Sequence, residues 1–273
     1  MPNSFNLKKL IFKGASTTYY YSSMFFTPEV KDAVFTLYAY VRYADDLIDT
    51  VPPKIREFKK FREDTKKAFE GKKVGFPIID DFAELAREKD FDPQWTWAFL
   101  DAMESDLTTH TYDTYKDLQV YMHGSAEVIG LFMSKIFDTP EVAYPYAQAQ
   151  GEAMQFINFI RDIQEDHELG RQYIPTEDLK KFKTHIPPKP HEIENFCKLV
   201  RFEIQRYKKI QAKADKGNPY IQRRFRIMVK TSAGMYNWTA RQIEKNPMIV
   251  FEKKVKPNKW YVILSALKYA IFS

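Results

Sequence analysis

Two segments of this 273-residue chain each carry a pair of aspartates four residues apart within an otherwise apolar helical pattern. The first segment spans residues 38–49 and the second spans residues 151–171. Residues three and four apart lie on the same face of an α-helix, so each segment places two carboxylates on one stripe. Like charges one turn apart repel each other, and each pair therefore requires solvent or a cation beside it.

The aspartates share their stripes with other polar groups. The first stripe contains Tyr38, Arg42, Asp45 and Asp49, and the second contains Gln155, Asn158, Asp162 and Asp166. One such pair alone is more often a solvated helix face, but a solvated helix is polar all round, and both segments are apolar elsewhere. If the two helices face each other, four carboxylates meet in one cavity. Oxygen ligands of this kind suit Mg²⁺, which usually keeps positions for water or a substrate phosphate.

Helical patterns extend over the whole chain. A residue suited to helix capping precedes proline at Thr27-Pro28, Asp92-Pro93, Thr139-Pro140 and Asn218-Pro219, and such pairs typically begin helices. Proline and glycine breaks divide the chain into about ten helical patterns with short connections. No stretch shows the sustained two-residue alternation of a strand. We therefore predict an all-α bundle that forms a single domain over residues 1–273, with a central active-site cavity.

Composition and charge restrict the partners. The net charge of +6 and the pI near 9.0 suit anionic ligands or an anionic membrane surface. The basic residues are dispersed and form no nucleic-acid-binding motif, so no nucleic-acid partner is expected. The single cysteine, Cys197, excludes an internal disulfide and fits a cytoplasmic protein. The sequence does not define the oligomeric state.

The apolar C-terminal segment, residues 260–272, is too short to span a bilayer and is interrupted by Lys268. We expect a core or interfacial helix there, and peripheral contact with a membrane is consistent with it. Within residues 120–130, Gly124 and Gly130 interrupt an apolar helix. Glycine costs about 1 kcal/mol relative to alanine in a helix, so we expect a close helix approach or room for a ligand at these positions. We interpret His123 in the same segment as structural.

The two aspartate segments, together with Gly170-Arg171-Gln172-Tyr173-Ile174-Pro175 after the second, resemble the squalene/phytoene synthase family of head-to-head prenyltransferases. The resemblance implies an isoprenoid-synthase helical bundle that acts on prenyl diphosphates. It implies that Mg²⁺, or Mn²⁺ in its place, is bound by Asp45, Asp49, Asp162 and Asp166. It also implies that phosphate oxygens are held by Ser16, Thr18, Arg42 and Arg161. Tyr38, Gln155 and Asn158 would then line the site, and the aromatic faces of Tyr38, Tyr121 and Tyr236 would stabilise carbocations.

The reaction implied by the resemblance joins two geranylgeranyl diphosphates through a cyclopropylcarbinyl intermediate, prephytoene diphosphate, to give phytoene and diphosphate. Small residues at Ser22 and Ser23 favour the 20-carbon substrate. The alternative within the family is condensation of farnesyl diphosphate to dehydrosqualene or squalene. No G-x-G-x-x-G motif occurs, and we expect no use of NADPH.

Two further alternatives remain. A class I terpene cyclase is consistent with the spacing of Asn158, Asp162 and Asp166, although the second aspartate pair argues against it. A non-enzymatic assembly factor should have lost the metal-binding acids. The chain also departs from the family pattern at Glu127, where relatives often have glycine, and at Lys253-Lys254, where relatives have an arginine.

Overall fold

Helix starts follow the predicted pairs of capping residue and proline at two of four places. The computed structural model describes residues 26–272, so Ser16, Thr18, Ser22 and Ser23 lie outside the described residues. Helix α3 (Pro28–Asp49) begins after Thr27, whose side chain accepts a hydrogen bond from the Val30 amide. Helix α6 (Pro93–Ser105) begins after Asp92, which caps the Gln94 amide in the same way. Capping side chains satisfy amides that have no partner within the helix.

The other two pairs lie at short 3₁₀ turns and not at the first turn of an α-helix, which corrects the prediction there. Thr139-Pro140 leads into η3 (Glu141–Ala143), and Asn218-Pro219 belongs to η5 (Asn218–Tyr220). The remaining elements are α4 (Ile55–Phe69), α5 (Pro77–Glu88), α7 (Tyr115–Met122), η2 (His123–Glu127), α8 (Val128–Ile136), α9 (Tyr144–Arg161), α10 (Ile163–Glu168), α11 (Thr176–Phe182), η4 (Pro190–Glu192), α12 (Ile193–Asp215), α13 (Arg223–Lys245), η6 (Pro247–Phe251) and α14 (Lys259–Phe272). Residues 26–272 contain no strand, only one isolated bridge between Thr111 and Gln172.

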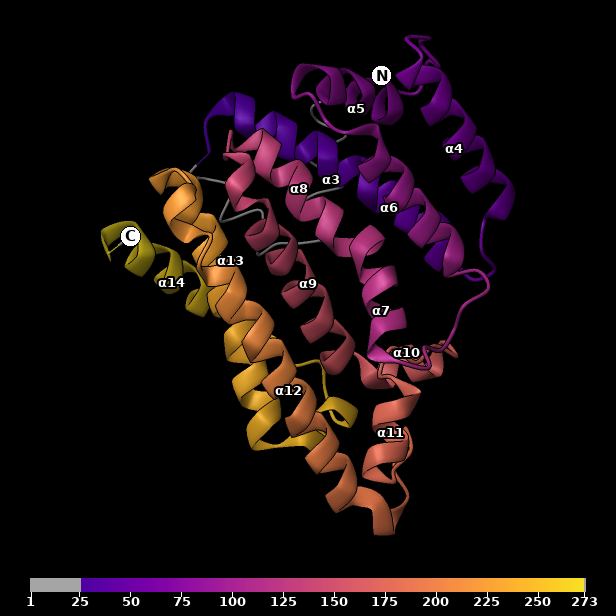
Figure 1. The fold of residues 1–273 in the computed structure, drawn as a ribbon, viewed down its shortest axis with the longest axis vertical. Coiled ribbons are helices and arrows are strands. Elements are labelled where there is room, and N and C mark those ends of the chain that lie inside the picture. Colours follow the sequence, from indigo (N-terminus) through magenta and orange to yellow (C-terminus); the bar gives the residue numbers. More distant parts are fainter. Residues whose placement is uncertain (1–25, 273) are drawn as a thin grey trace.

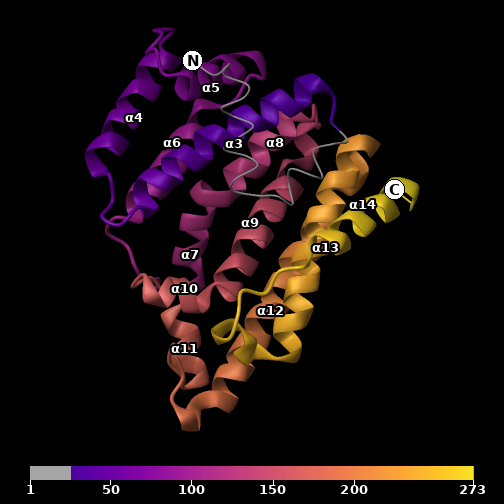
Figure 2. The same cartoon turned by 180° about the vertical axis from the view of Figure 1, so that it is seen from behind.

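Helix α9 runs through the middle of the bundle and packs against α8, α12 and α13 (Figure 1). Helices α3 to α6 lie together at one end, and α10 and α11 lie at the other (Figures 1 and 2). Helix α14 lies at the outer edge against α13 in both views. One cluster of buried apolar side chains extends from Ala33 to Val255, so the same core holds α3 and α9 in position.

Gly124 and Gly130 permit close helix crossings, which is one of the two explanations expected from the sequence. A Cβ atom on Gly124 would lie 2.3 Å from the carbonyl oxygen of Ala98 on α6, and one on Gly130 would lie 2.2 Å from that of Ala147 on α9. These distances are shorter than any normal contact, so the helices approach as closely as they do because side chains are absent. The π-helical turn η2 lies in this segment.

The second aspartate segment is not one continuous helix, contrary to the sequence prediction. Helix α9 ends at Arg161, and Asp162 leaves the helical region with φ −99° and ψ 16° before α10 begins. The Asp166 amide still donates to the Asp162 carbonyl at 2.8 Å, so the one-turn relation between these residues is kept. None of the helices within residues 26–272 is both long and apolar enough to cross a bilayer.

Candidate functional site

The first stripe lies on α3, near its C-terminal end. Arg42 donates to Asp45 at 2.8 Å through Nη1 and lies 2.5 Å from Asp46 through Nη2. Asp49, one turn further on, ends the helix. One guanidinium therefore contacts two carboxylates on α3 and balances only one of their two negative charges, and Asp49 interacts with another part of the chain.

The second stripe lies where α9 meets α10. Arg161 forms a two-point contact with Asp162, with Nε–Oδ1 at 2.8 Å and Nη2–Oδ2 at 2.5 Å. Lys254 lies 3.5 Å from the same carboxylate and 2.5 Å from Glu165. The sequence analysis singled out Lys253-Lys254 only as a departure from the family pattern, and the structure brings Lys254 beside Asp162, a predicted metal ligand.

Arg171 connects the two stripes. Its Nη1 atom lies 2.8 Å from Oδ1 of Asp49, and its amide donates to the Asp166 carbonyl at 2.8 Å. Its positive charge also lowers the pKa of Asp166, partly offsetting the effects that raise it. The guanidinium therefore lies within electrostatic range of an aspartate from each pair. Sequence reasoning used Arg171 only as part of the family motif and gave it no role.

Burial opposes ionisation in each pair. It raises the pKa of Asp45 to about 7, with the negative charge of Asp49 as the next cause. It likewise raises the pKa of Asp166 to about 7, with the charge of Asp162 adding to the shift. Repulsion between neighbouring carboxylates is the effect expected from aspartates one turn apart. Both pairs therefore gain from any additional cation.

Asp106 is a buried carboxylate behind this site that the sequence analysis missed. It accepts hydrogen bonds from the hydroxyls of Tyr121 at 2.8 Å and Tyr173 at 3.5 Å. Burial raises the pKa of Asp106 to about 6, and the hydrogen bond from Tyr121 opposes this increase. The charge of Arg171 also lowers this pKa, whereas the charge of Asp49 raises it. In the sequence, Asp106 follows a helical pattern and precedes a polar loop, which is the usual position of a solvated acid. No spacing links it to either stripe.

The other predicted residues lie on three helices. Tyr38 and Tyr236, from α3 and α13, are within electrostatic range of each other. Tyr236 also interacts electrostatically with Arg161. Helix α13 therefore lies beside both stripes. Gln155 and Asn158 are half-buried on α9. The Oδ1 atom of Asn158 is buried and has no hydrogen-bond partner.

The carboxylates are held by the protein's own cations. Among residues 26–272, no three His, Cys, Asp or Glu side chains lie close enough together to hold a metal ion. The donor chemistry nevertheless suits a hard cation, since both stripes offer carboxylate oxygens and Asn158 offers an unpaired amide oxygen.

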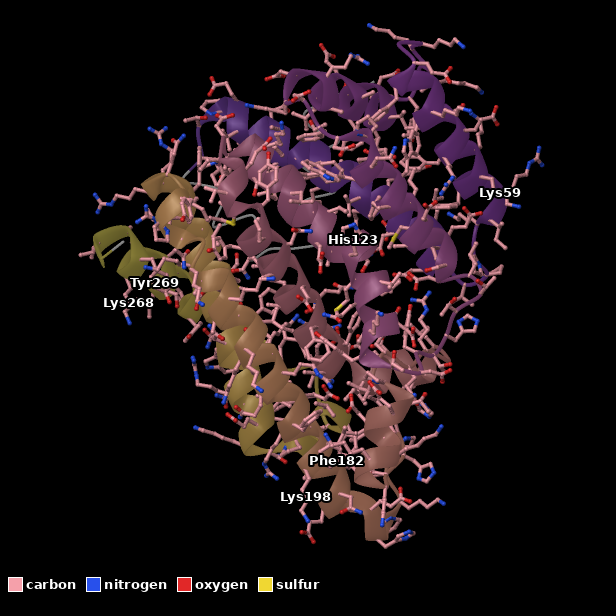
Figure 3. All side chains as sticks on the ribbon, in the orientation of Figure 1. Lys59, His123, Phe182, Lys198, Lys268 and Tyr269 are labelled. Carbon is pink, nitrogen blue, oxygen red and sulfur yellow. The ribbon has the colours of Figure 1, made fainter. Side chains whose placement is uncertain are left out.

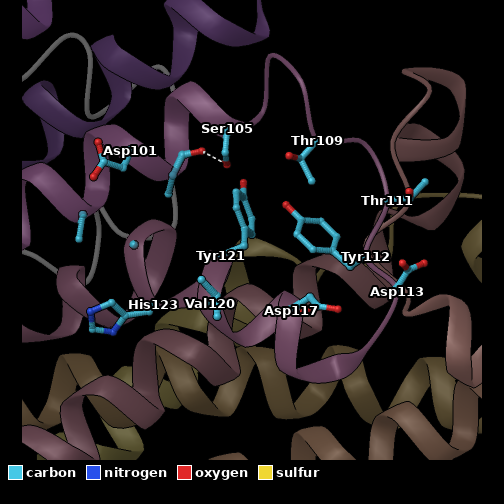
Figure 4. A pocket seen from close by; sticks show the side chains of 13 residues that line it. Asp101, Ser105, Thr109, Thr111, Tyr112, Asp113, Asp117, Val120, Tyr121 and His123 are labelled. Atoms are coloured by element: carbon cyan, nitrogen blue, oxygen red, sulfur yellow. Dashed lines mark hydrogen bonds between the residues drawn. The ribbon is translucent and has the colours of Figure 1, made fainter.

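A pocket of about 600 Å³ lies between α6, α7 and the loop at residues 109–113 (Figure 4). Tyr112 and Tyr121 stand side by side in its wall, with ring centroids 5.5 Å apart. The four aspartates of the stripes are not among its lining residues. At its rim, His123 Nδ1 lies 3.0 Å from Glu127, which also accepts a hydrogen bond from Gln148 at 3.2 Å. Glu127 thus ties η2 to α9.

Comparison with known proteins identifies the class. The squalene/phytoene synthase family model matches residues 12–261. The chain belongs to this family and is a prenyltransferase with the all-α isoprenoid-synthase fold. The resemblance stated from the motifs is therefore confirmed, as is the predicted fold class.

Individual relatives are distant. The chain is 24% identical over 277 residues to a phytoene synthase from Arthrospira platensis, covering 94% of this chain and 89% of the relative. It is 29% identical over 204 residues to a 4,4'-diapophytoene synthase from Staphylococcus haemolyticus, covering 70% of each. The crystal structure of a squalene synthase from Alicyclobacillus acidocaldarius superposes with a TM-score of 0.80 at 20% identity, covering 89% of this chain and 93% of that one. This structural likeness shows a shared fold.

Proposed function

We propose that the protein catalyses the Mg²⁺-dependent head-to-head condensation of two geranylgeranyl diphosphates to phytoene. The observation that carries the proposal is the position of Arg171, which contacts Asp49 and lies within electrostatic range of Asp166. Such a contact would bring the two aspartate pairs toward one region, as a shared diphosphate site requires. Similarity to phytoene synthases supports the choice of reaction.

The oxygen donors for Mg²⁺ would be Asp45, Asp49, Asp162 and Asp166, with Mn²⁺ as the substitute ion. When bound, the metal supplies positive charge that stabilises the departing diphosphate. Arg42, Arg161 and Arg171 lie within the same cluster of charges, and their guanidinium groups suit two-point binding of phosphate oxygens. The family resemblance implies an arginine near Lys253-Lys254, and Lys254, which lies beside Asp162, would offer a point charge instead of a fork.

In the proposed reaction, the C1–O bond of one substrate breaks and diphosphate leaves. The allylic cation is attacked by the double bond of the second substrate, and loss of a proton gives the cyclopropylcarbinyl diphosphate. A second ionisation, rearrangement and proton loss give phytoene, so two substrates yield one hydrocarbon and two diphosphates. The rings of Tyr38, Tyr121 and Tyr236 would stabilise the cations without capturing them. Their burial would keep water away from the cations.

Condensation of farnesyl diphosphate is the second candidate, because the diapophytoene synthase is 29% identical over 70% of the chain, whereas two phytoene synthases are 24% and 27% identical over 94% and 87% of it. We further propose a cytoplasmic location, where the lone thiol of Cys197 would stay reduced.

The test is incubation of the purified full chain with Mg²⁺ and either geranylgeranyl or farnesyl diphosphate, with and without NADPH. Extracted hydrocarbons are identified by mass. We expect a 40-carbon product that does not require NADPH and is lost on chelation of the metal. A 30-carbon product formed only from farnesyl diphosphate would replace the proposed substrate with the second candidate. A cyclised product from one substrate, or no hydrocarbon from either, would overturn head-to-head condensation.

A further inference from the structure

Helix α14 carries apolar side chains on two opposite faces, and only one of these faces is buried. Val262 and Ala266, one turn apart, are buried with 3% and 7% of their surface exposed. On the same face, Tyr269 packs against Gly234 of α13, where the hydroxyl lies 3.2 Å from the position of a Cβ atom. Helix α13 is the main neighbour of α14, and among residues 26–272 no other helix lies over its outer side in Figures 1 and 2.

The opposite face of α14 exposes four large apolar side chains. They are Trp260, Leu264, Leu267 and Ile271, with 63%, 64%, 52% and 69% of their surfaces exposed. Their spacings of four, three and four residues place all of them within about 60° of one another around the helix axis. We call these four residues the α14 stripe. A continuous apolar face of this kind marks an interaction surface, since single exposed apolar residues are normally scattered.

The surroundings of the α14 stripe are positively charged. Glu252 is the last acid in the sequence, and the lysines after it are Lys253, Lys254, Lys256, Lys259 and Lys268. Lys259 lies directly beside Trp260, with Nζ 5.6 Å from the ring centroid. Lys268 lies at the outer side of α14 (Figure 3). A tryptophan next to lysines at the edge of an apolar face is typical of helices that lie in a membrane interface.

We propose that α14 is a membrane-docking helix, which inserts the α14 stripe into the surface of an anionic bilayer while Lys259 and Lys268 contact lipid phosphates. At 14 residues, α14 is about 21 Å long and would lie parallel to the membrane plane. The surface is separate from the aspartate stripes, and the proposal does not depend on the identity of the substrate.

Charge distinguishes a bilayer from a second copy of the chain as the partner. A twofold contact between two α14 stripes would bring Lys259 and Lys268 of both copies together, and α14 itself contains no acid to pair with them. The area is also small, because four side chains cover less than the roughly 800 Å² per partner that a stable protein interface buries. An anionic lipid surface satisfies both the charge and the apolar side chains.

The test measures binding of the full chain to sedimented vesicles of phosphatidylcholine, with and without about one third phosphatidylglycerol. We expect binding that requires the anionic lipid and weakens as salt is raised. The double variant Leu264→Gln/Leu267→Gln should bind at least about 100-fold more weakly, since each leucine removed from the bilayer costs roughly tenfold or more. Lys259→Glu/Lys268→Glu should weaken binding to anionic vesicles about tenfold or more.

Val142→Gln is the matched control. The side chain of Val142 is about as exposed as those of Leu264 and Leu267, but Val142 lies far from α14 in the sequence and does not belong to the α14 stripe. It should bind vesicles as the wild type does. All variants should keep wild-type helicity by circular dichroism, which shows that they are folded whether or not the proposed reaction occurs and so separates failure of this proposal from failure of that reaction. Wild-type binding that needs no anionic lipid, or that survives the double leucine substitution, would overturn the proposal. So would a wild-type dimer that the same substitution converts to a monomer.

Discussion

Two of the regions in which the bundle buries carboxylates differ in how their negative charge is balanced. In the closed region, Arg206 on α12 donates to Asp178 on α11 at 2.9 Å and to Glu203 at 2.5 Å. Glu203 is completely buried. The guanidinium also lies 4.1 Å from the centre of the Tyr115 ring. In the closed region, a single arginine is therefore enclosed by two carboxylates and an aromatic ring.

The open region holds more acids than cations. Its acids are Asp45, Asp46, Asp49, Asp106, Asp162, Glu165 and Asp166, and its cations are Arg42, Arg161, Arg171 and Lys254. Asp45 and Asp49 expose 34% and 41% of their side chains, so ions can reach them from solvent.

The difference is the one expected between acids that serve only the structure and acids of the proposed site. In the closed region, the excess negative charge can be removed by keeping a proton, since burial raises the pKa of Glu203 to about 8 against the opposing charge of Arg206. In the open region, an added cation can balance the excess negative charge at a lower free-energy cost, because ions can reach these carboxylates from solvent. The predictions below test this contrast.

The largest effect is expected from neutralising an acid of the open region. Asp162→Asn and Asp45→Asn should each lower kcat/KM by at least about 1000-fold, equivalent to about 4 kcal/mol of transition-state stabilisation. Each removes a proposed metal ligand. Steady-state kinetics with saturating Mg²⁺ measures the loss, and circular dichroism should show unchanged helicity.

Glu168→Gln is the control for these substitutions. It removes an exposed carboxylate from α10, close to Asp166 in sequence but outside the predicted stripe. Its activity should equal that of the wild type. A fully active Asp162→Asn variant would remove that residue from the metal site.

A smaller loss is expected at Asp106, which we regard as a positioning residue for Tyr121. Asp106→Asn should lower kcat about 10- to 100-fold with little change in KM, because the Tyr121 hydroxyl loses its charged acceptor while the substrate phosphates keep their contacts. Tyr121→Phe should produce the same pattern.

Tyr112→Phe separates this role from a general effect on packing. The Tyr112 hydroxyl is buried in the same tyrosine cluster but has no hydrogen-bond partner. Its removal should leave kcat and KM unchanged. If KM rose and kcat stayed constant in Asp106→Asn, the residue would act on substrate binding instead.

The sequence was sufficient to predict the features that depend only on local helical periodicity. The stripe of Tyr38, Arg42, Asp45 and Asp49 lies on one helix because spacings of three and four do not depend on the rest of the fold. The family assignment followed from the order of the same motifs. The break at Asp162 was missed, since the pattern of Asn158, Asp162 and Asp166 remains helical across one distorted residue.

Contacts between distant segments were not predictable in the same way. Arg171 reaches Asp49 across 122 positions of sequence, and Asp106 meets Tyr173 across 67. Nothing in the spacing of either pair signals the contact. Glu203 and Arg206 are one turn apart and read as an ordinary solvated pair on α12, because only the packing of α11 and Tyr115 buries them.

Glu203→Gln tests the closed region through stability. The folded-state pKa of about 8 lies above the ordinary value of 4.5, so the folded protein holds this proton more tightly. The resulting stability is complete below about pH 4.5 and is lost as the pH rises through about 8. Glutamine mimics the neutral acid and does not titrate. Relative to the wild type, Glu203→Gln should gain on the order of 3 kcal/mol of unfolding free energy between pH 5 and pH 8.

Urea denaturation at pH 5, 6.5 and 8 measures this gain. Glu194→Gln, which alters an exposed glutamate on the same helix, should show no comparable change between these pH values. A Glu203→Gln variant that loses stability relative to the wild type as the pH rises would mean that the glutamate is ionised when buried.

The smallest effect is expected at the edge of the open region, where Lys254 is 40% exposed. Lys254→Met should raise KM only about 3- to 10-fold, because an exposed charge contributes roughly 1 kcal/mol and salt screens it. The difference from the wild type should shrink as ionic strength rises. Lys253→Met is the control, because Lys253 is exposed and forms no ion pair within residues 26–272, so its KM should not change. Equal effects of both substitutions would mean that Lys254 acts through the general positive charge of the protein. An effect confined to Lys254 would mean that its contact with Asp162 places it where the substrate phosphates bind.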